Sequence, residues 1–157
     1  MFFKPRPMTG IAAPMTGTAV KLCDVPDPIF AEKIVGDGIA IVPSGNEVAA
    51  PFDGQVVQIA HTRHALALRD ETGIEFLIHM GIDTVQMKEN AFSYTVKVGD
   101  KVNKGDVLLR VDWEMIRGGG YNTISPCLIL NYKSMRQTKF YYGDVAAGET
   151  RIMDVLV

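Results

Sequence analysis

Short apolar runs separated by turn residues dominate the chain. Each run is rich in Val, Ile, Leu or Phe and is bounded by Gly, Pro, Asp or Asn, a pattern typical of β-strands. Turn signals recur about every ten residues, the spacing that favours a sandwich or barrel. The clearest predicted strands are Ile39–Val42, Gln55–Ile59, Glu75–Ile78, Val107–Val111 and Leu128–Leu130.

Helical patterns are confined to two short stretches. Pro28–Lys33 begins with a proline, and Asp112–Arg117 is followed directly by the three glycines Gly118–Gly120. We therefore predict an all-β protein, a β-sandwich of antiparallel sheets of the barrel-sandwich hybrid type with short helical turns.

One segment of the chain echoes another. Ile11–Val20 and Val48–Val57 both read apolar-Ala-Ala-Pro-apolar-x-Gly-x-apolar-Val, which predicts a strand, a bend at proline, a glycine turn and a second strand. Val98–Leu108 repeats the alternation of turn and strand. These repeats are too few and too unequal for a solenoid, so we expect two similar β layers closed over one core.

Composition narrows the class of protein. The chain has 157 residues, of which 47% are hydrophobic, and this suits one domain with a sizeable core. A net charge of −2 provides no general basic field for nucleic acid or anionic membranes. Cys23 and Cys127 form no metal-type pair and are expected to be reduced thiols. Without a signal peptide or a membrane-spanning run, the protein is expected to be cytoplasmic.

The chemistry that the sequence suggests lies in a predicted hairpin, with arms His64–Arg69 and Ile74–His79 around the turn Asp70–Gly73. Closing this turn symmetrically, with a loop of two or four residues, places His64 directly opposite His79, with Cβ atoms about 4.5–5.5 Å apart. Strand alternation then puts Thr62 on the same face and His61 on the other. A one-residue bulge would break this register. The alternation also assigns Leu66, Leu68, Glu75 and Leu77 to the histidine face, and Ala65, Ala67, Phe76 and Ile78 to the opposite face.

Two facing imidazoles suit phosphoryl transfer. A neutral imidazole, with an ordinary pKa of about 6.5, is a good nucleophile near neutral pH and can form a phosphoramidate. The second ring can hydrogen-bond the phosphoryl oxygens, and the Thr62 hydroxyl could fix its tautomer. Geometry alone leaves two other interpretations open. The pair could be purely structural, or His61, His64 and His79 could bind zinc, with Asp83 as the nearest further ligand.

The stretch Phe76–Val85 closely resembles the active-site signature of the glucose-type enzyme IIA domain of the bacterial phosphoenolpyruvate-dependent sugar phosphotransferase system. The resemblance continues, in the same order, through Asp27–Ile41, Ala50–Gly54 and Thr62–Ala65, and several long matches in order are far more specific than one short motif. It covers the chain from about Gly17 to the end. It therefore implies a flexible N-terminal segment over residues 1–16 and an enzyme IIA β-sandwich domain over residues 17–157.

The resemblance also implies the roles of individual residues. His79 would be the phosphorylated nucleophile, His64 would stabilise the phosphoryl group and pass it onward, and Thr62 would hydrogen-bond a histidine. No cofactor is expected beyond the covalent phosphohistidine, although His64 and His79 could hold adventitious zinc. The docking rim for partner proteins would be formed by Asp27, Ile29, Phe30, Asp83 and Val85.

In the terms of this family, the protein would be a phosphotransferase that serves sugar uptake. The donor would be the phosphorylated histidine-containing carrier protein, and the acceptor a cysteine on the IIB domain of a sugar permease. The protein would also bind regulatory target proteins, and it would touch a membrane at most peripherally.

Three other classes stay open from the sequence. A zinc-dependent hydrolase on a similar sandwich would need an activated water and a general base. A regulatory binding module could keep the fold without the transfer. The alternation of turn and strand over Val98–Leu108 also suggests a biotin- or lipoyl-like carrier. Such a carrier presents a modified lysine at a hairpin tip, but the predicted hairpin turn here, Asp70–Gly73, contains no lysine.

Overall fold

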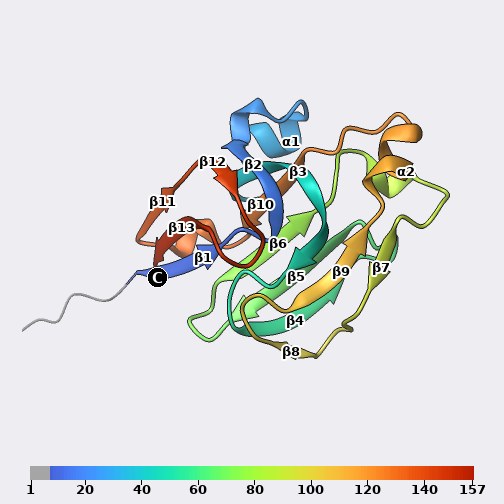
Figure 1. Ribbon diagram of the computed structural model, residues 1–157. Coiled ribbons are helices and arrows are strands. Elements are labelled where there is room, and N and C mark those ends of the chain that lie inside the picture. The colour runs from blue at the N-terminus through green and yellow to red at the C-terminus, as the bar shows by residue number, and fades with distance from the viewer. Residues whose placement is uncertain (1–7) are drawn as a thin grey trace, which may run out of the picture.

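The computed structural model describes residues 8–157 and contains two antiparallel sheets (Figure 1). The larger sheet has the strand order β12-β2-β3-β10-β6-β5-β4-β8, with β9 paired to β3 and β7 paired to β9, and the smaller has the order β1-β13-β11. The predicted all-β sandwich is confirmed. The strands are β1 (Thr9–Ala12), β2 (Met15–Lys21), β3 (Asp37–Ala49), β4 (Gly54–Ile59), β5 (Ala65–Asp70), β6 (Glu75–His79), β7 (Phe92–Tyr94), β8 (Lys101–Val102), β9 (Val107–Val111), β10 (Ser125–Ile129), β11 (Gln137–Phe140), β12 (Gly143–Val145) and β13 (Arg151–Leu156).

The long strand β3 joins the parts of the larger sheet. Its first half pairs with β2 and β10, whereas its last residues, from Glu47 to Ala49, pair with β9. The register with β9 shifts between Val48 and Ala49, where the strand departs from regular pairing. Irregularities of this kind bend a strand and increase its twist, and here they let the sheet curl around one apolar core. Fully buried members of that core include Ile39, Ile41, Leu66, Phe76 and Leu108.

The two echoed segments meet each other in the fold. The Ala12 N–H donates to the Pro51 carbonyl at 2.9 Å, and the Ala49 N–H donates to the Pro14 carbonyl at 2.7 Å. Ala12 and Ala49 occupy the same position in the two copies of the repeat, and so do Pro14 and Pro51, so each copy donates one equivalent bond to the other. The repetition read from the sequence therefore corresponds to two similar strand-bend-strand units that are joined reciprocally at their proline bends.

The folded domain begins earlier than the boundary at residue 17 that the sequence suggested. Strand β1 pairs with β13, and Ile11 and Met15 have no exposed surface. Apolar side chains at these positions fill the core, which is why residues 9 to 16 belong to the sandwich rather than to a flexible segment. Residues 1–7 of that expected segment lie outside the described residues.

Both predicted helical turns are present. Helix α1 (Pro28–Ala31) is capped by the Asp27 side chain, and α2 (Trp113–Gly118) is capped by that of Asp112. No helix within residues 8–157 is long and apolar enough to cross a membrane. The described residues also form the short 3₁₀ helices η1 (Leu22–Asp24), η2 (Thr84–Gln86) and η3 (Tyr132–Ser134).

A second, smaller apolar cluster lies on the outer face of β3, β6 and β10. Its members alternate along these strands with residues of the main core, so they point to the other side of the sheet. Helix α1 covers this face and contributes Phe30 to the cluster (Figure 1). His79 alternates with the core residue Ile78 and therefore emerges on the face that α1 partly covers. The cluster consists of Leu22, Val25, Phe30, Ala40, Ile82, Ile124 and Leu128, with Leu77 packed against it.

Candidate phosphotransfer site

The β5–β6 hairpin has a different register from the symmetrical one that the sequence suggested. His79 pairs with Ala65, not with His64, and Arg69 pairs with Glu75. The predicted direct opposition of the histidines is therefore wrong by one residue, and so are the faces assigned to β5. Leu66 and Leu68 belong to the main core, while Ala65 and Ala67, which alternate with them, share the face of His79.

The cause of this shift is the hairpin loop. The Asp70 N–H donates to the Ile74 carbonyl at 3.1 Å, so these two residues close a loop of odd length rather than an even one. The Asp70 carboxylate accepts from the backbone N–H groups of Thr72 and Ile74 at 3.0 and 2.9 Å. Gly73, with φ 96°, supplies the left-handed residue that such loops require.

The two imidazole rings still meet, by a different route. Their centroids lie 4.9 Å apart and their planes are inclined by 77°. His64 precedes β5 and belongs to the turn that follows β4, so it does not obey the alternation of the strand. In this turn Arg63 has a left-handed φ of 65°, and its carbonyl accepts a hydrogen bond from the Tyr94 hydroxyl at 2.7 Å. Ala65, opposite His79, is small and leaves space for the ring.

His79 is held in one tautomer. Its Nδ1 lies 2.7 Å from the Gly81 carbonyl, which can only accept, so Nδ1 carries the proton and Nε2 keeps a free lone pair. On another side the Phe30 ring packs against His79, with centroids 4.8 Å apart and planes inclined by 57°. The His79 ring, with its free Nε2, is thereby oriented by a backbone bond and two neighbouring rings.

His64 is oriented by Thr62, the contact expected from the sequence. The Thr62 hydroxyl lies 2.5 Å from His64 Nδ1. When this hydroxyl donates to Nδ1, the proton of the neutral ring sits on Nε2. His64 can then donate from Nε2 to a negatively charged oxygen beside His79, and a hydrogen bond to an ionised group is stronger than a neutral one.

Both histidines favour the neutral form. Burial lowers the pKa of His64 from 6.5 to about 4, and the nearby His79 lowers it further in the same direction. Burial also lowers the pKa of His79, although the Gly81 hydrogen bond and the charges of Asp27 and Asp83 act in the opposite direction. A protonated imidazole has no free lone pair, so these shifts favour the form of each ring that keeps one.

Two carboxylates flank the histidines. The Asp27 side chain accepts from the Ile29 N–H at 3.0 Å and so begins α1. Asp83 has a left-handed φ of 61°, a conformation that Asp adopts more readily than most residues, and it precedes η2. Both negative charges act on His79, so the structure brings the two acidic residues of the expected docking rim to the site.

The apolar residues of the expected rim divide into two groups. Ile29 and Val85 are each 48% exposed and present apolar surface beside the histidines. Phe30, in contrast, is only 6% exposed and belongs to the cluster beneath α1. The Phe30 ring therefore supports His79 from within, and its place in the docking rim stays a prediction.

The zinc site that the sequence left open needs several ligands close together. Within residues 8–157, no group of three or more His, Cys, Asp or Glu side chains is arranged to hold a metal ion. His61 is exposed on the turn before Thr62. The third histidine therefore does not complete the zinc site that the sequence left open.

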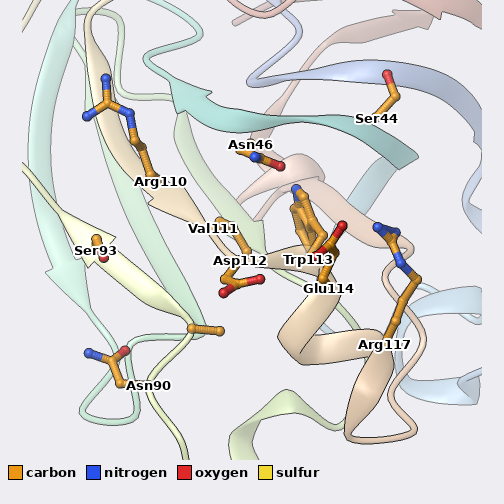
Figure 2. A pocket seen from close by; sticks show the side chains of 11 residues that line it. Ser44, Asn46, Asn90, Ser93, Arg110, Val111, Asp112, Trp113, Glu114 and Arg117 are labelled. Carbon is orange, nitrogen blue, oxygen red and sulfur yellow. The ribbon is translucent and has the colours of Figure 1, made fainter.

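A separate polar cleft of about 630 Å³ lies between α2, β3, β7 and β9 (Figure 2). Arg110 and Arg117 lie at its sides, and Trp113 lies between them. Among the described residues that line it there is no histidine and no member of the expected docking rim. The candidate phosphotransfer site is instead an open surface formed by α1, the turn before β5 and the segment after β6.

Sequence reasoning missed four residues that hold the pair in place. Gly81 and Thr84 lie in the signature Phe76–Val85, a few residues after His79. The sequence therefore placed them near the site but did not indicate their hydrogen bonds. Tyr94 and Ser125 are distant along the chain, and no local pattern connects either of them with a histidine. Tyr94 donates to Arg63, and Ser125 accepts from Gly81.

Comparison with known proteins relates this chain to one family. Residues 9–135 match the family described as the phosphoenolpyruvate-dependent sugar phosphotransferase system, EIIA 1. A glucose-specific EIIA component of this system from Staphylococcus epidermidis is 42% identical over 150 residues, covering 94% of this chain and 89% of the relative. The corresponding component from Staphylococcus aureus is 41% identical over 146 residues, covering 92% and 88%.

A solved structure has the same architecture. The glucose permease IIA from Mycoplasma capricolum superposes with a TM-score of 0.86 at 32% sequence identity, covering 98% of this chain and 99% of that one. The fold and the sequence relationship therefore point to the same family.

Proposed function

Because the chain belongs to the EIIA 1 family of the phosphoenolpyruvate-dependent sugar phosphotransferase system, we propose that His79 is the residue on which it carries the phosphoryl group. The protein is a phosphotransferase component, a phosphocarrier in sugar uptake. One observation supports the assignment to His79 above all. Its Nδ1 proton is committed to the Gly81 carbonyl, which leaves the Nε2 lone pair free beside a second, neutral imidazole.

In the accepting step, His79 Nε2 attacks the phosphorus of a phosphohistidine on the donor protein. A new N–P bond forms as the donor's N–P bond breaks, and the bonding electron pair returns to the donor's ring nitrogen. No proton has to move, because the Nδ1 proton of His79 remains on the Gly81 carbonyl. Catalysis then depends on positioning and on stabilising the charge of the phosphoryl oxygens.

His64 supplies that stabilisation and supports the delivering step. Its Nε2–H, set by the Thr62 hydroxyl, donates to a phosphoryl oxygen on His79. In delivery, a cysteine thiolate of a IIB domain attacks phosphorus, an S–P bond forms, and the electron pair of the N–P bond returns to His79 Nε2. The transfer uses two imidazoles and a hydroxyl and needs no cofactor.

Partners dock on the surface that surrounds the pair. We assign this role to Asp27 and Asp83, which attract basic side chains, and to the exposed Ile29 and Val85. The donor is the phosphorylated histidine-containing carrier protein and the acceptor is the IIB domain. The staphylococcal relatives are named glucose-specific, so glucose uptake is the first process in which to test this chain.

Labelling tests the assignment. The purified chain is mixed with the carrier protein, its phosphorylating enzyme and ³²P-phosphoenolpyruvate, and acid-labile, base-stable label on the chain is measured. We expect His79→Ala to take up no label, and His64→Gln to take up label but fail to deliver it to a IIB domain. His61→Ala, a matched change at the exposed third histidine, is expected to do both.

Normal labelling of His79→Ala would end the assignment of the nucleophile. Full delivery by His64→Gln would remove the role given to His64 while leaving that of His79 in place.

A further inference from the structure

The peptide group that joins Met80 to Gly81 is held at both ends by side-chain hydroxyls. The Thr84 hydroxyl donates to the Met80 carbonyl at 2.7 Å, and the Gly81 N–H donates to Ser125 Oγ at 3.1 Å. Thr84 belongs to η2, and Ser125 is the first residue of β10. Two elements that are distant in the sequence therefore fix the orientation of one peptide plane directly after His79.

The next peptide group carries the carbonyl that binds His79. The Gly81 carbonyl accepts the Nδ1 proton of His79, and the N–H at the other end of the same peptide, that of Ile82, donates to the Asn122 carbonyl at 2.9 Å. Gly81 has a left-handed φ of 78°, and a Cβ there would lie 2.7 Å from Thr84 Cγ2. The two peptides meet at the Gly81 Cα, so the Gly81 carbonyl is held by the Asn122 bond to its own peptide and, through the preceding peptide, by Ser125 and Thr84.

The hydroxyls of Thr84 and Ser125 are buried, unlike most polar side chains among the described residues. Among residues 8–157, the buried polar or charged side chains are Asp70, Thr84 and Ser125, and the last two are only 1% and 0% exposed. Asp70 serves the hairpin loop, whereas Thr84 and Ser125 both serve the loop after His79. Burying a hydroxyl costs free energy unless hydrogen bonds compensate, so these two positions call for an explanation.

The hydrogen bonds of Ser125 have a fixed direction. Its hydroxyl donates to the Thr123 carbonyl at 2.9 Å, so its oxygen is left to accept the Gly81 N–H. A fully satisfied buried hydroxyl of this kind resists rotation of the peptide it binds. If Ser125 were absent, the Gly81 N–H would lose its partner in a buried environment.

We propose that Ser125 and Thr84 are positioning residues for phosphoryl transfer, which hold the Gly81 carbonyl where it fixes His79 in its Nδ1–H tautomer. This inference rests on the proposed role of His79 as the nucleophile. Neither hydroxyl touches the phosphoryl group. Both act through the Met80–Gly81 peptide, and their loss frees the His79 ring to rotate or to move its proton to Nε2, where no lone pair would remain for attack.

The test uses the full chain with two single substitutions and one rescue. Ser125→Ala removes the acceptor for the Gly81 N–H, and Thr84→Val removes the donor to the Met80 carbonyl while keeping the side chain's shape. We expect each to slow phosphoryl acceptance by roughly 10- to 100-fold, the range typical of small misplacements of a reacting group. Ser125→Thr keeps the hydroxyl and is expected to restore most of the rate.

The decisive readout is the ¹⁵N spectrum of the His79 ring, which distinguishes a protonated nitrogen from one with a free lone pair. In the wild type we expect a single tautomer with the proton on Nδ1. In Ser125→Ala and Thr84→Val we expect a mixture of tautomers. Ser93→Ala, an exposed serine in the polar cleft, and Ile152→Val, a core change in the smaller sheet, are the matched controls and should leave the ring signals unchanged.

The outcomes separate this inference from the proposed function. If both variants keep the wild-type tautomer and the wild-type rate, the positioning role is wrong, even though His79 is labelled normally. If the wild type itself takes no label on His79, the proposed function fails, while the ring spectra still decide whether the hydroxyls set the tautomer. A slow Ser125→Ala that Ser125→Thr does not rescue would also contradict the role of the hydroxyl.

Discussion

At the scale of single residues, the site depends on keeping two imidazoles neutral while they lie side by side. Burial lowers the pKa of His64 to about 4 and also lowers that of His79. We therefore expect the His64 ring to titrate with a midpoint near pH 4, and the His79 ring to titrate below the ordinary 6.5. Measuring the ring chemical shifts of both histidines by NMR between pH 3 and 8 checks this. A midpoint for His64 at or above the ordinary 6.5 would contradict it.

Asp83 offers a way to shift one of these midpoints. Its negative charge stabilises protonated His79 and raises the pKa of that ring. Asp83→Asn removes the charge and suits the left-handed backbone, since Asn adopts a positive φ as readily as Asp. The expected result is a lower titration midpoint for His79. Asp53→Asn, at a carboxylate that accepts from the Lys104 N–H, is the control and should leave the midpoint in place. An unchanged midpoint in Asp83→Asn would show that its charge does not reach the ring.

At the scale of elements, the hairpin shows what local sequence could and could not predict. Both strands and the polar turn between them were predicted, because alternating apolar residues and a terminal glycine mark them. The register was not, because it depends on whether Asp70 pairs with Gly73 or with Ile74, a difference of one residue that its side-chain hydrogen bonds decide. The histidines were nevertheless expected together, and they are together because His64 lies outside the strand.

The turn before β5 is the element that brings His64 to His79. Arg63 adopts a left-handed conformation there, and Tyr94 holds its carbonyl. Tyr94→Phe removes only that hydroxyl, so we expect a loss of about 0.5–1.5 kcal/mol in the free energy of unfolding. We also expect slower delivery of the phosphoryl group, because the His64 ring loses its fixed position, together with an unchanged His79 tautomer.

Chemical denaturation and transfer assays measure both effects of this substitution. Tyr142→Phe, at an exposed tyrosine, is the matched control. Delivery at the wild-type rate by Tyr94→Phe would mean that the turn holds its shape without this bond.

At the scale of the whole molecule, the site is assembled from segments that are far apart in the sequence. Helix α1, the turn before β5, the segment after β6 and the start of β10 all contribute. The family resemblance indicated the first three, because it includes the stretches Asp27–Ile41, Thr62–Ala65 and Phe76–Val85. Ser125 could not be found this way, because only the pairing of β10 with β3 and β6 places it beneath Gly81.

The smaller sheet extends this assembly to the N-terminal part of the chain. Ile11 in β1 is fully buried, so Ile11→Ala should cost about 2–5 kcal/mol in the free energy of unfolding, through lost burial and a residual cavity. Ile34→Ala makes the same change at a residue that is 68% exposed and should stay within about 0.5 kcal/mol of the wild type. Urea unfolding measures both. Equal stabilities would indicate that β1 contributes little to the domain.

The neutral histidines also couple the site to the stability of the entire fold. In the unfolded chain His64 binds a proton near pH 6.5, whereas in the folded protein it does so only near pH 4. Between these values the unfolded state holds more protons, so the free energy of unfolding falls as the pH falls through this window. Below it both states are protonated, and His64 adds no further loss. The variant His64→Gln lacks this proton uptake and should lose less stability than the wild type between pH 6.5 and pH 4. Urea unfolding at several pH values measures this. If the stabilities of the two proteins changed equally across the window, the folded state would accommodate a charged His64 without penalty.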